Sequence, residues 1–369
     1  MRLVSFEVKT PIGPVRRIGA LTPNAEPDEA SRIVDLTAGY SMLLREGGEP
    51  LWREIGEATM TPDMVSFLKG GAGSRERAQQ VLEFAAQAKP SQDDAAGQLV
   101  YARSEVKLLA PVPRPTTLHD FSVYQTHMTA HSGSTEKAPQ WYFFPPGYKG
   151  NPTAMYGPED PMLWPAYSEY LDPELEPAIY VCKSGRNITP EEAKDYIGGY
   201  TILIDMSARD VHAREMFGPF KSKDFGSIMG PCMVTPDEFD ETNARCSLKV
   251  NGETWWEGNT GETRNYLLPD LVAYVSDGET LNPGDAIAAG TVGMSCSVDS
   301  DRWVKPGDVV EHWIEGIGTI RTTVQREINP NSYVRDGMPG RVPATDPAKQ
   351  WLANLKGSAP LHRSRTVVL

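Results

Sequence analysis

The sequence has no apolar run near the roughly 20 residues that a membrane-spanning helix needs. Its first residues, MRLVSFEVKTPIG, also lack the long apolar core of a secretory signal peptide. These absences argue against a membrane or secreted protein, and we expect a cytoplasmic one.

Cysteine is scarce and scattered. Cys182, Cys232, Cys246 and Cys296 form no C-x-x-C pair, so neither a zinc knuckle nor a disulfide framework is indicated. Four isolated thiols fit a reducing compartment.

Several catalytic motifs are also missing. No P-loop or Rossmann glycine pattern precedes a helix, and no G-x-S-x-G turn occurs, which argues against nucleotide-binding and serine-hydrolase functions. Positive charge is in deficit, with 36 Lys and Arg against 49 Asp and Glu and a formal net charge of −13. This balance argues against nucleic acid and anionic membranes as main partners. An anionic substrate stays open, because a bound metal can reverse the field inside a pocket.

What the sequence does have is a pair of glutamates one residue apart, in LDPELEPAIYV. The alternation predicts a strand, which would place Glu174 and Glu176 on one face about 6–7 Å apart. Carboxylates this close repel each other unless a cation lies between them. A second apolar strand, TILIDMSARD, adds Asp205. Three acids without Cys or His nearby in sequence indicate Mg²⁺, Mn²⁺ or Ca²⁺ rather than zinc; the alternative is a solvated, exposed strand.

The chain divides into three zones. Residues 1–107 begin with strand-like pieces, the third being RIVDLTAGY, and then become helical, with an amphipathic helix over residues 74–88. Residues 108–330 open with the proline-rich junction LLAPVPRPTT and continue as short strands between Pro/Gly turns. A Thr189–Glu192 capping box predicts one helix there, from Thr189 to Ile197. Residues 331–369 read as a tail with one short helix. The predicted class is α+β and strand-rich.

Further acid/base candidates lie in the middle zone. Asp120 and His127, in LHDFSVYQTHMTAH, would share one helix face, with His131 beside them. A single His is more often a hydrogen-bonded surface or core residue than a catalyst. Lys223 could bind an enolate or carboxylate oxygen, or be a solvated loop lysine. Thr291, in AAGTVG, could contact a substrate carboxylate or form a strand-capping turn.

Together these segments resemble the fumarylacetoacetate hydrolase family, from about Leu108 to Val324. The ordered motifs are LLAPVPRP, the E-L-E strand, SGRNITPEEAKDYIGGYTILIDMSARD, KSKDFGSIMGP, AAGTVG and KPGDVVEHWIEGIGTI. DFSVYQTH and PPGYKG look closer to the fumarylacetoacetase type than to the short acylpyruvase type. The resemblance implies a catalytic domain built around a mixed β-roll, a smaller N-terminal domain and a homodimer.

The resemblance also implies roles for individual residues. The carboxylates expected to hold Mg²⁺, or alternatively Mn²⁺ or Ca²⁺, are Asp120, Glu174, Glu176 and Asp205. His127 is implied as the general base, Glu311 as the acid that orients it, and Lys223 as the lysine near the metal and substrate oxygens. The implied substrate contacts are Tyr148, Arg209 and Thr291.

The chain departs from the family pattern at several positions. Pro173 and Pro177 flank the two glutamates and each lacks a backbone donor, so we expect an edge strand or a bulge there. Ser122 stands where the hydrolase type has a tyrosine, and Ala130 stands where the acylpyruvase type has a glutamate. These departures leave the identity of the substrate open.

The expected activity is hydrolysis of a carbon–carbon bond in a small 1,3-diketo acid. Such an acid would be an acylpyruvate or a fumarylacetoacetate-like compound of aromatic catabolism, cleaved through a metal-bound enolate and a His127-activated water. One alternative is decarboxylation or tautomerisation of a β-keto acid, or hydration of a dienoate, through the same enolate. Another is a binding protein that retains only the fold.

Overall fold

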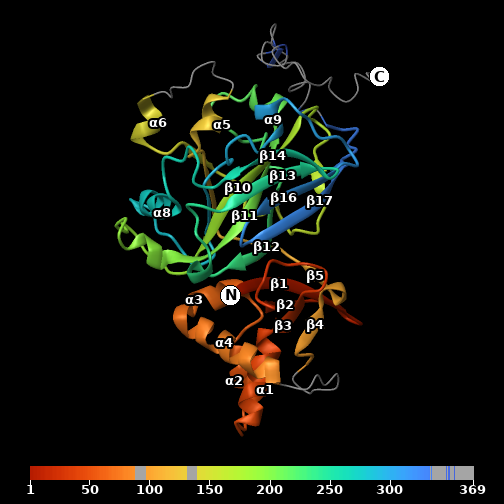
Figure 1. Ribbon diagram of the computed structural model, residues 1–369, viewed down its shortest axis with the longest axis vertical. Helices are drawn as coiled ribbons and strands as arrows, with labels where there is room; N and C mark the ends of the chain where they lie inside the picture. The colour runs from red at the N-terminus through yellow and green to blue at the C-terminus, as the bar shows by residue number, and fades with distance from the viewer. Residues whose placement is uncertain are drawn as a thin grey trace.

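The computed structural model describes residues 1–87, 97–130 and 139–332, together with residues 334, 346, 348, 349 and 353. The fold is α+β and strand-rich, with one large and one smaller mixed sheet (Figure 1), which confirms the predicted class. His131 and most of the predicted tail over 331–369 lie outside the described residues. Within those residues no helix combines the length and hydropathy needed to cross a bilayer.

The N-terminal part forms the lower lobe in Figure 1. Its strands are β1 (Arg2–Thr10), β2 (Gly13–Thr22), β3 (Arg32–Asp35), β4 (Val100–Ala102) and β5 (Val106–Leu108). Its helices are α1 (Leu36–Glu46), α2 (Trp52–Thr59), α3 (Met64–Lys69) and α4 (Gly71–Gln87), with the 3₁₀ turn η1 (Arg103–Glu105) before β5. The helix predicted over 74–88 is α4, which buries Val81.

The prediction of a strand through RIVDLTAGY is wrong beyond Asp35. The Asp35 carboxylate accepts the Ala38 backbone N–H at 2.9 Å and caps α1, so the chain turns helical at Leu36. Apolar alternation over a few residues did not distinguish the short strand from the helix that follows it.

The large sheet spans both lobes in the order β4-β3-β2-β1-β12-β11-β10-β15-β6-β7. Its strands in the upper lobe are β6 (Leu118–Phe121), β7 (Gly147–Lys149), β8 (Met155–Tyr156), β10 (Leu171–Val181), β11 (Ile197–Ala208), β12 (Ser227–Val234) and β15 (Ala286–Ala288). Arg2 and Leu3 of β1 pair with the end of β12, which joins the two lobes through one sheet. The domain boundaries at residues 107 and 330 stay predictions.

The smaller sheet packs over the central strands and completes the core of the upper lobe. Its order is β14 (Glu253–Asn259), β13 (Arg245–Val250), β16 (Val309–Ile314), β17 (Gly318–Arg326) and β9 (Met162–Trp164). The helices that follow β6 in the chain are α5 (Gln125–Thr129), α6 (Pro139–Phe143), α7 (Arg209–His212), α8 (Leu268–Ser276) and α9 (Ser297–Ser300). A further 3₁₀ turn is η3 (Pro236–Glu238). In Figure 1, α5 and α9 lie at the end of the upper lobe remote from the N-terminal elements.

The predicted helix over Thr189–Ile197 is shorter and tighter than expected. The reciprocal capping contacts between Thr189 and Glu192 are present at 3.2 and 3.3 Å. However, only the 3₁₀ segment η2 (Ala193–Tyr196) follows them, because Ile197 already begins the long strand β11. Tertiary pairing with β10 prevails over local helix signals here.

The backbone nitrogens of Pro173 and Pro177 in β10 face away from β11. Among the described residues, β10 pairs with β11 alone over residues 171–177, and β15 pairs with residues 178–180. The Pro173 and Pro177 carbonyls accept from the His312 ring and the Ala289 N–H respectively. Neither proline therefore removes a hydrogen bond between β10 and β11. Over these residues β10 is an edge strand only on the side that faces away from β11. The expected bulge is not at the prolines; the register shifts at Tyr180/Val181.

Candidate metal centre and active site

The glutamate pair occupies one face of β10, as the strand period requires. Glu174 lies opposite Asp205 of β11 in the antiparallel register. Asp120 comes from β6, on the other side of β15 from β10. All four acidic side chains are buried, with exposures of at most 1%. Predicted acids from three strands therefore converge inside the upper lobe.

Three of the four predicted ligands form a compact cluster. Asp120, Glu176 and Asp205 each offer a carboxylate oxygen, and these oxygens lie within 4.8 Å of one another. Burial and mutual repulsion raise the pKa of Asp120 and of Glu176 well above the ordinary range. Among the described residues, neither oxygen of Asp120 has a hydrogen-bond partner, and Oδ1 of Asp205 has none. Buried oxygens without donors suit a hard divalent cation, so this cluster fits Mg²⁺ or Mn²⁺.

Glu174, the fourth predicted ligand, belongs to a different environment. Its Oε1 accepts from the Thr291 hydroxyl at 2.8 Å and from the Arg209 guanidinium, and its Oε2 accepts from the Ser207 hydroxyl at 2.9 Å. Burial alone would raise the pKa of Glu174, but the charges of Arg209 and Lys223 hold it well below its usual range. Glu174 is thus a charge-compensated carboxylate next to the three-acid cluster.

Lys223 joins the two environments. Its Nζ lies 2.6 Å from Glu174 Oε2 and also contacts Asp205 Oδ2. Tyr148 of β7 donates its hydroxyl to the same Asp205 oxygen at 2.9 Å, and its ring centroid is 5.2 Å from Lys223 Nζ. The predicted Lys223, Tyr148, Arg209 and Thr291 therefore all lie within this site.

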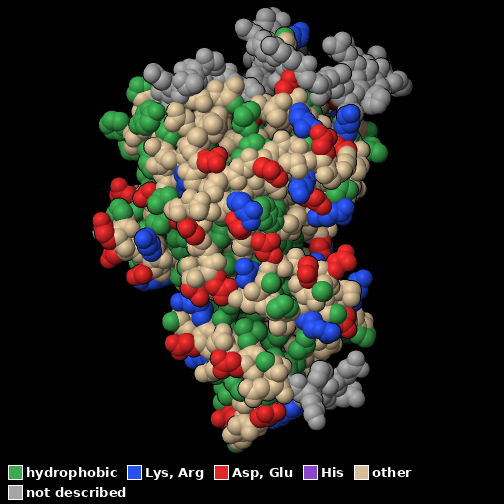
Figure 2. Space-filling view, viewed as in Figure 1, with side chains coloured by type: hydrophobic (Ala, Val, Ile, Leu, Met, Phe, Trp, Pro, Cys, Tyr) green, Lys and Arg blue, Asp and Glu red, His purple; other side chains and the backbone are tan. Residues whose placement is uncertain are grey.

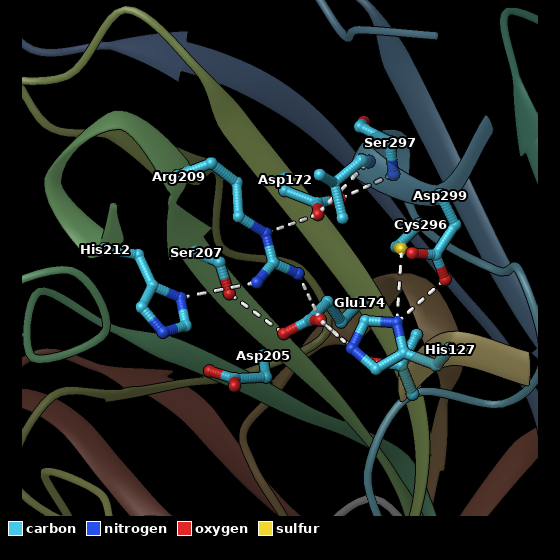
Figure 3. Close-up of polar contacts among 12 residues, drawn as sticks. His127, Asp172, Glu174, Asp205, Ser207, Arg209, His212, Cys296, Ser297 and Asp299 are labelled. Carbon is cyan, nitrogen blue, oxygen red and sulfur yellow. Dashed lines mark hydrogen bonds and ion pairs between the residues drawn. The ribbon is translucent and has the colours of Figure 1, made fainter. Parts of the chain in front are cut away.

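His127 reaches the site from α5 and lies between two carboxylates (Figure 3). Its Nε2 is 3.4 Å from Glu174 Oε1, and its Nδ1 is 2.8 Å from Asp299 Oδ2. Burial alone would lower the pKa of His127, but the Asp299 carboxylate raises it above its ordinary value. The expected shared helix face with Asp120 is wrong, because Asp120 lies on strand β6 and the helix begins only at Gln125.

The prediction that Glu311 orients His127 is wrong. Glu311 lies in β16, and its carboxylate accepts from Arg321 of β17 at 2.9 Å, on the partly exposed smaller sheet. The carboxylate that bonds to His127 Nδ1 is Asp299, in the one-turn helix α9. Asp299, in SCSVDSD, follows no strand or helix period, so the sequence offered no signal for it.

A buried network positions α9 and therefore Asp299. The Asp172 carboxylate accepts the backbone N–H groups of Ser297 at 2.5 Å and of Val298 at 3.3 Å. Its Oδ2 also accepts from Arg209 Nε at 2.7 Å. Figure 3 shows Arg209 between Asp172 and Glu174, and Asp299 on the far side of His127. Asp172 and Asp299 are the site residues that sequence reasoning missed.

Comparisons with known proteins relate the chain to a family. Residues 116–325 match the family model described as fumarylacetoacetate (FAA) hydrolase C-terminal. The oxaloacetate tautomerase YisK of Bacillus subtilis is 31% identical over 274 residues, covering 72% of this chain and 87% of that protein. The human mitochondrial oxaloacetate tautomerase FAHD2A is 29% identical over 310 residues, covering 80% and 92%.

A solved structure shares the fold. Maleylpyruvate hydrolase from Sphingobium sp. SYK-6, in complex with manganese(II) and pyruvate, superposes with a TM-score of 0.62 at 24% identity, over 89% of this chain and 100% of that one. Because the family model spans more than half of the chain and its strands carry the clustered acids, this protein belongs to the fumarylacetoacetate hydrolase family.

Proposed function

We propose that the protein is a divalent-cation-dependent enzyme that interconverts the keto and enol forms of a small β-keto acid of the oxaloacetate type. The observation that carries this proposal is the position of His127, held by Asp299 and facing Glu174 beside the three-acid cluster. Relatives named oxaloacetate tautomerases that match most of the chain support this reaction.

Asp299 determines which ring nitrogen of His127, the proposed base, carries the proton. The shorter contact, 2.8 Å from Nδ1 to the Asp299 carboxylate, holds the proton of neutral His127 on Nδ1, so Nε2, 3.4 Å from Glu174 Oε1, is the nitrogen that can accept a proton. Such a nitrogen takes a proton from the carbon next to a keto group, and Asp299 stabilises the imidazolium that forms. The same imidazolium returns the proton, which completes a tautomerisation.

Two fixed cations stabilise negative charge near that base. The Arg209 guanidinium and Lys223 Nζ both contact Glu174, which itself faces His127. Burial would lower the pKa of Lys223, but Asp205 and Glu174 raise it, so the amine stays charged. These groups would bind a substrate carboxylate and the oxygen on which charge develops.

The acid cluster would hold the metal. Asp120, Glu176 and Asp205, with Glu174 next to them, would bind Mg²⁺ or Mn²⁺. A bound ion of this kind supplies Lewis-acid polarisation of a substrate carbonyl.

Hydrolysis of an acylpyruvate is a second candidate. The buried Asp299–His127 pair favours it, because a carboxylate-oriented imidazole is the arrangement that activates water or a hydroxyl nucleophile. The two reactions differ in their products: hydrolysis adds water and releases pyruvate, whereas tautomerisation changes only the position of a proton.

A substrate panel separates the candidates. Purified protein with Mg²⁺ or Mn²⁺ should accelerate the loss of enol absorbance from freshly dissolved oxaloacetate, and EDTA should abolish the effect. Release of pyruvate from acylpyruvates, without acceleration of oxaloacetate enolisation, would favour hydrolysis instead. Release of CO₂ from oxaloacetate would identify a decarboxylase. No metal-dependent activity on any of these acids would contradict the proposal.

The quaternary structure is also a proposal. Resemblance to the family leads us to propose a homodimer, and light scattering after size exclusion should give about twice the chain mass of 40.6 kDa.

A further inference from the structure

The loop over residues 213–222 connects two cations of the proposed site. Arg209 begins helix α7, which directly precedes this loop, and Lys223 directly follows it. The Arg209 guanidinium and Lys223 Nζ both contact the Glu174 carboxylate. The position of one cation relative to the other therefore depends on how the 213–222 loop closes.

The tip of the 213–222 loop contributes little packing of its own. The side chains of Met216, Phe217 and Phe220 are 85%, 96% and 73% exposed. Gly218 has a φ of 94°, which turns the chain at the tip. A loop that buries so few apolar side chains depends on hydrogen bonds to keep one conformation.

A single carboxylate closes the base of the loop. Glu215 Oε2 accepts the Phe220 backbone N–H at 3.0 Å and the Ser222 hydroxyl at 2.5 Å. Glu215 Oε1 accepts the Ser222 backbone N–H at 3.1 Å. The backbone N–H of Glu215 donates to the carbonyl of His212, the last residue of α7, at 3.1 Å. Glu215 thus joins the end of α7 to the residues that precede Lys223.

Strand β11 holds the same segment from its other side. Ser222 has no exposed surface, and its carbonyl accepts the Ala208 backbone N–H at 2.8 Å. Ala208 is the last residue of β11 and directly precedes Arg209. The backbone from which the Lys223 side chain starts is therefore held by β11 and by the Glu215 carboxylate together.

A fixed backbone matters for Lys223 because its ammonium has to lie between two carboxylates. Lys223 Nζ contacts Glu174 Oε2 and Asp205 Oδ2, and the residue is 9% exposed. A lysine side chain is a flexible four-carbon stem, so its charge stays in place only where the backbone and the partners are fixed. Misplacement of a group by about 1 Å, even by a change far from the chemistry, can cost about 100-fold in rate.

We propose that Glu215 is a positioning residue for Lys223. Its carboxylate closes the 213–222 loop and so holds the Lys223 ammonium where it meets a substrate oxygen. The closure of the loop is a property of the hydrogen bonds of Glu215; only its effect on the rate rests on the proposed function.

A double-mutant cycle tests the effect on the rate. The value of kcat is measured for Glu215→Ala, Lys223→Ala and the double variant, on whichever acid of the panel is turned over. Glu215→Ala should lower kcat at least about tenfold, because the ammonium loses its support. The double variant should be as active as Lys223→Ala alone, because Glu215 acts through Lys223. Glu215→Gln, which keeps one acceptor oxygen, should lose less than Glu215→Ala.

The matched control is Asp63→Ala. The Asp63 carboxylate accepts the backbone N–H and the hydroxyl of Ser66, both at 2.8 Å, at the start of α3 in the lower lobe. This variant loses the same kind of contact and should keep kcat. An equal loss of kcat in Asp63→Ala would overturn the proposal. So would a double variant that loses the product of the two single losses, because Glu215 would then act independently of Lys223.

Hydrogen exchange followed by mass spectrometry tests the closure without any substrate. The Phe220 and Ser222 amides should exchange at least about tenfold faster in Glu215→Ala, while the amides of β12 keep their rates and show that the variant is folded. Unchanged exchange at Phe220 and Ser222 would overturn the closure. Faster exchange with full activity in Glu215→Ala would overturn the positioning role. Faster exchange in a protein inactive on every acid of the panel would support the closure and contradict the proposed function.

Discussion

Glu174 and Glu176 are two residues apart on the same buried face of β10, yet their surroundings differ. Glu174 is surrounded by donors, among them Arg209, Lys223 and Thr291. Glu176 accepts one backbone N–H, from Gly290 at 3.1 Å, and otherwise adjoins two further acids. The difference teaches that a buried carboxylate with matched cations stabilises the fold, whereas one among unmatched acids is a candidate for binding a cation.

The strongest test of this comparison is whether replacing each glutamate lowers or raises the free energy of unfolding. Glu174→Gln should lower the free energy of unfolding by about 3–5 kcal/mol, because it leaves Arg209 and Lys223 buried with less compensation. Glu176→Gln should leave stability in EDTA unchanged or raise it by about 1 kcal/mol, because it removes repulsion from Asp120 and Asp205. Urea denaturation in EDTA measures both. Equal losses in the two variants would remove the distinction.

The next test concerns the base that faces Glu174. His127→Ala should lower kcat at least about a hundredfold, since general-base assistance contributes about 10²–10⁴-fold. Affinity for Mn²⁺, measured by calorimetry, should not change, because the three-acid cluster stays intact. In contrast, Glu176→Ala should abolish tight Mn²⁺ binding, whereas the exposed Glu191→Ala should behave as the unmodified protein. Unchanged turnover in His127→Ala would exclude the base role.

The residue before Glu174 in β10 contacts a buried histidine. The ring of His312 donates to the Pro173 carbonyl at 3.2 Å. Complete burial lowers the pKa of this imidazole from 6.5 to about 4. The unfolded chain therefore binds this proton more readily, so the contribution is fully present above about pH 6.5 and is lost as the pH falls toward about 4. The loss at about pH 5 should be about 2 kcal/mol relative to about pH 7.5.

The control for this prediction is His312→Gln, which keeps a donor for Pro173 but does not titrate. Urea denaturation at the two pH values should show a smaller pH dependence in this variant, by about 2 kcal/mol. If the free energy of unfolding changes between the two pH values as much as in the unmodified protein, the pH dependence comes from groups other than His312.

The smallest expected effect concerns Asp299, which acts on the reaction through His127. Asp299→Asn should lower kcat about 10- to 100-fold while KM changes little, because the imidazole loses its orientation and the stabilisation of its charged form. The acidic limb of the rate profile should also move to lower pH, since Asp299 raises the pKa of His127. Glu311→Gln is the matched control and should match the unmodified protein, because its carboxylate pairs with Arg321. A loss in the control instead would restore the sequence-based assignment.

Charged side chains of both signs are mixed on the surface. On the face shown in Figure 2, Lys and Arg side chains alternate with Asp and Glu rather than gathering in one basic patch. That nucleic acid is not a main partner stays a prediction from the net charge of −13.

Much of the site could be predicted from local patterns. The strand period places Glu174 and Glu176 on one face, and the apolar run before Asp205 buries that acid in the neighbouring strand. The motifs around Lys223 and Thr291, and for Tyr148 the family resemblance, also led to residues that meet in the site. Predictions that depended on one element at a time fared worse, as the helix over Thr189–Ile197 and the shared face of Asp120 and His127 show.

The sequence by itself determined the strand-rich class, the family and the acids of β10 and β11, because backbone geometry fixes which side chains share a strand face. Only the tertiary structure decided which carboxylate has a cation for a partner, and that Asp299 rather than Glu311 contacts His127. The contacts of Asp299 with His127 and of Asp172 with Ser297 join residues more than 100 positions apart. Their electrostatics depend on distance and burial in space, which no local period encodes.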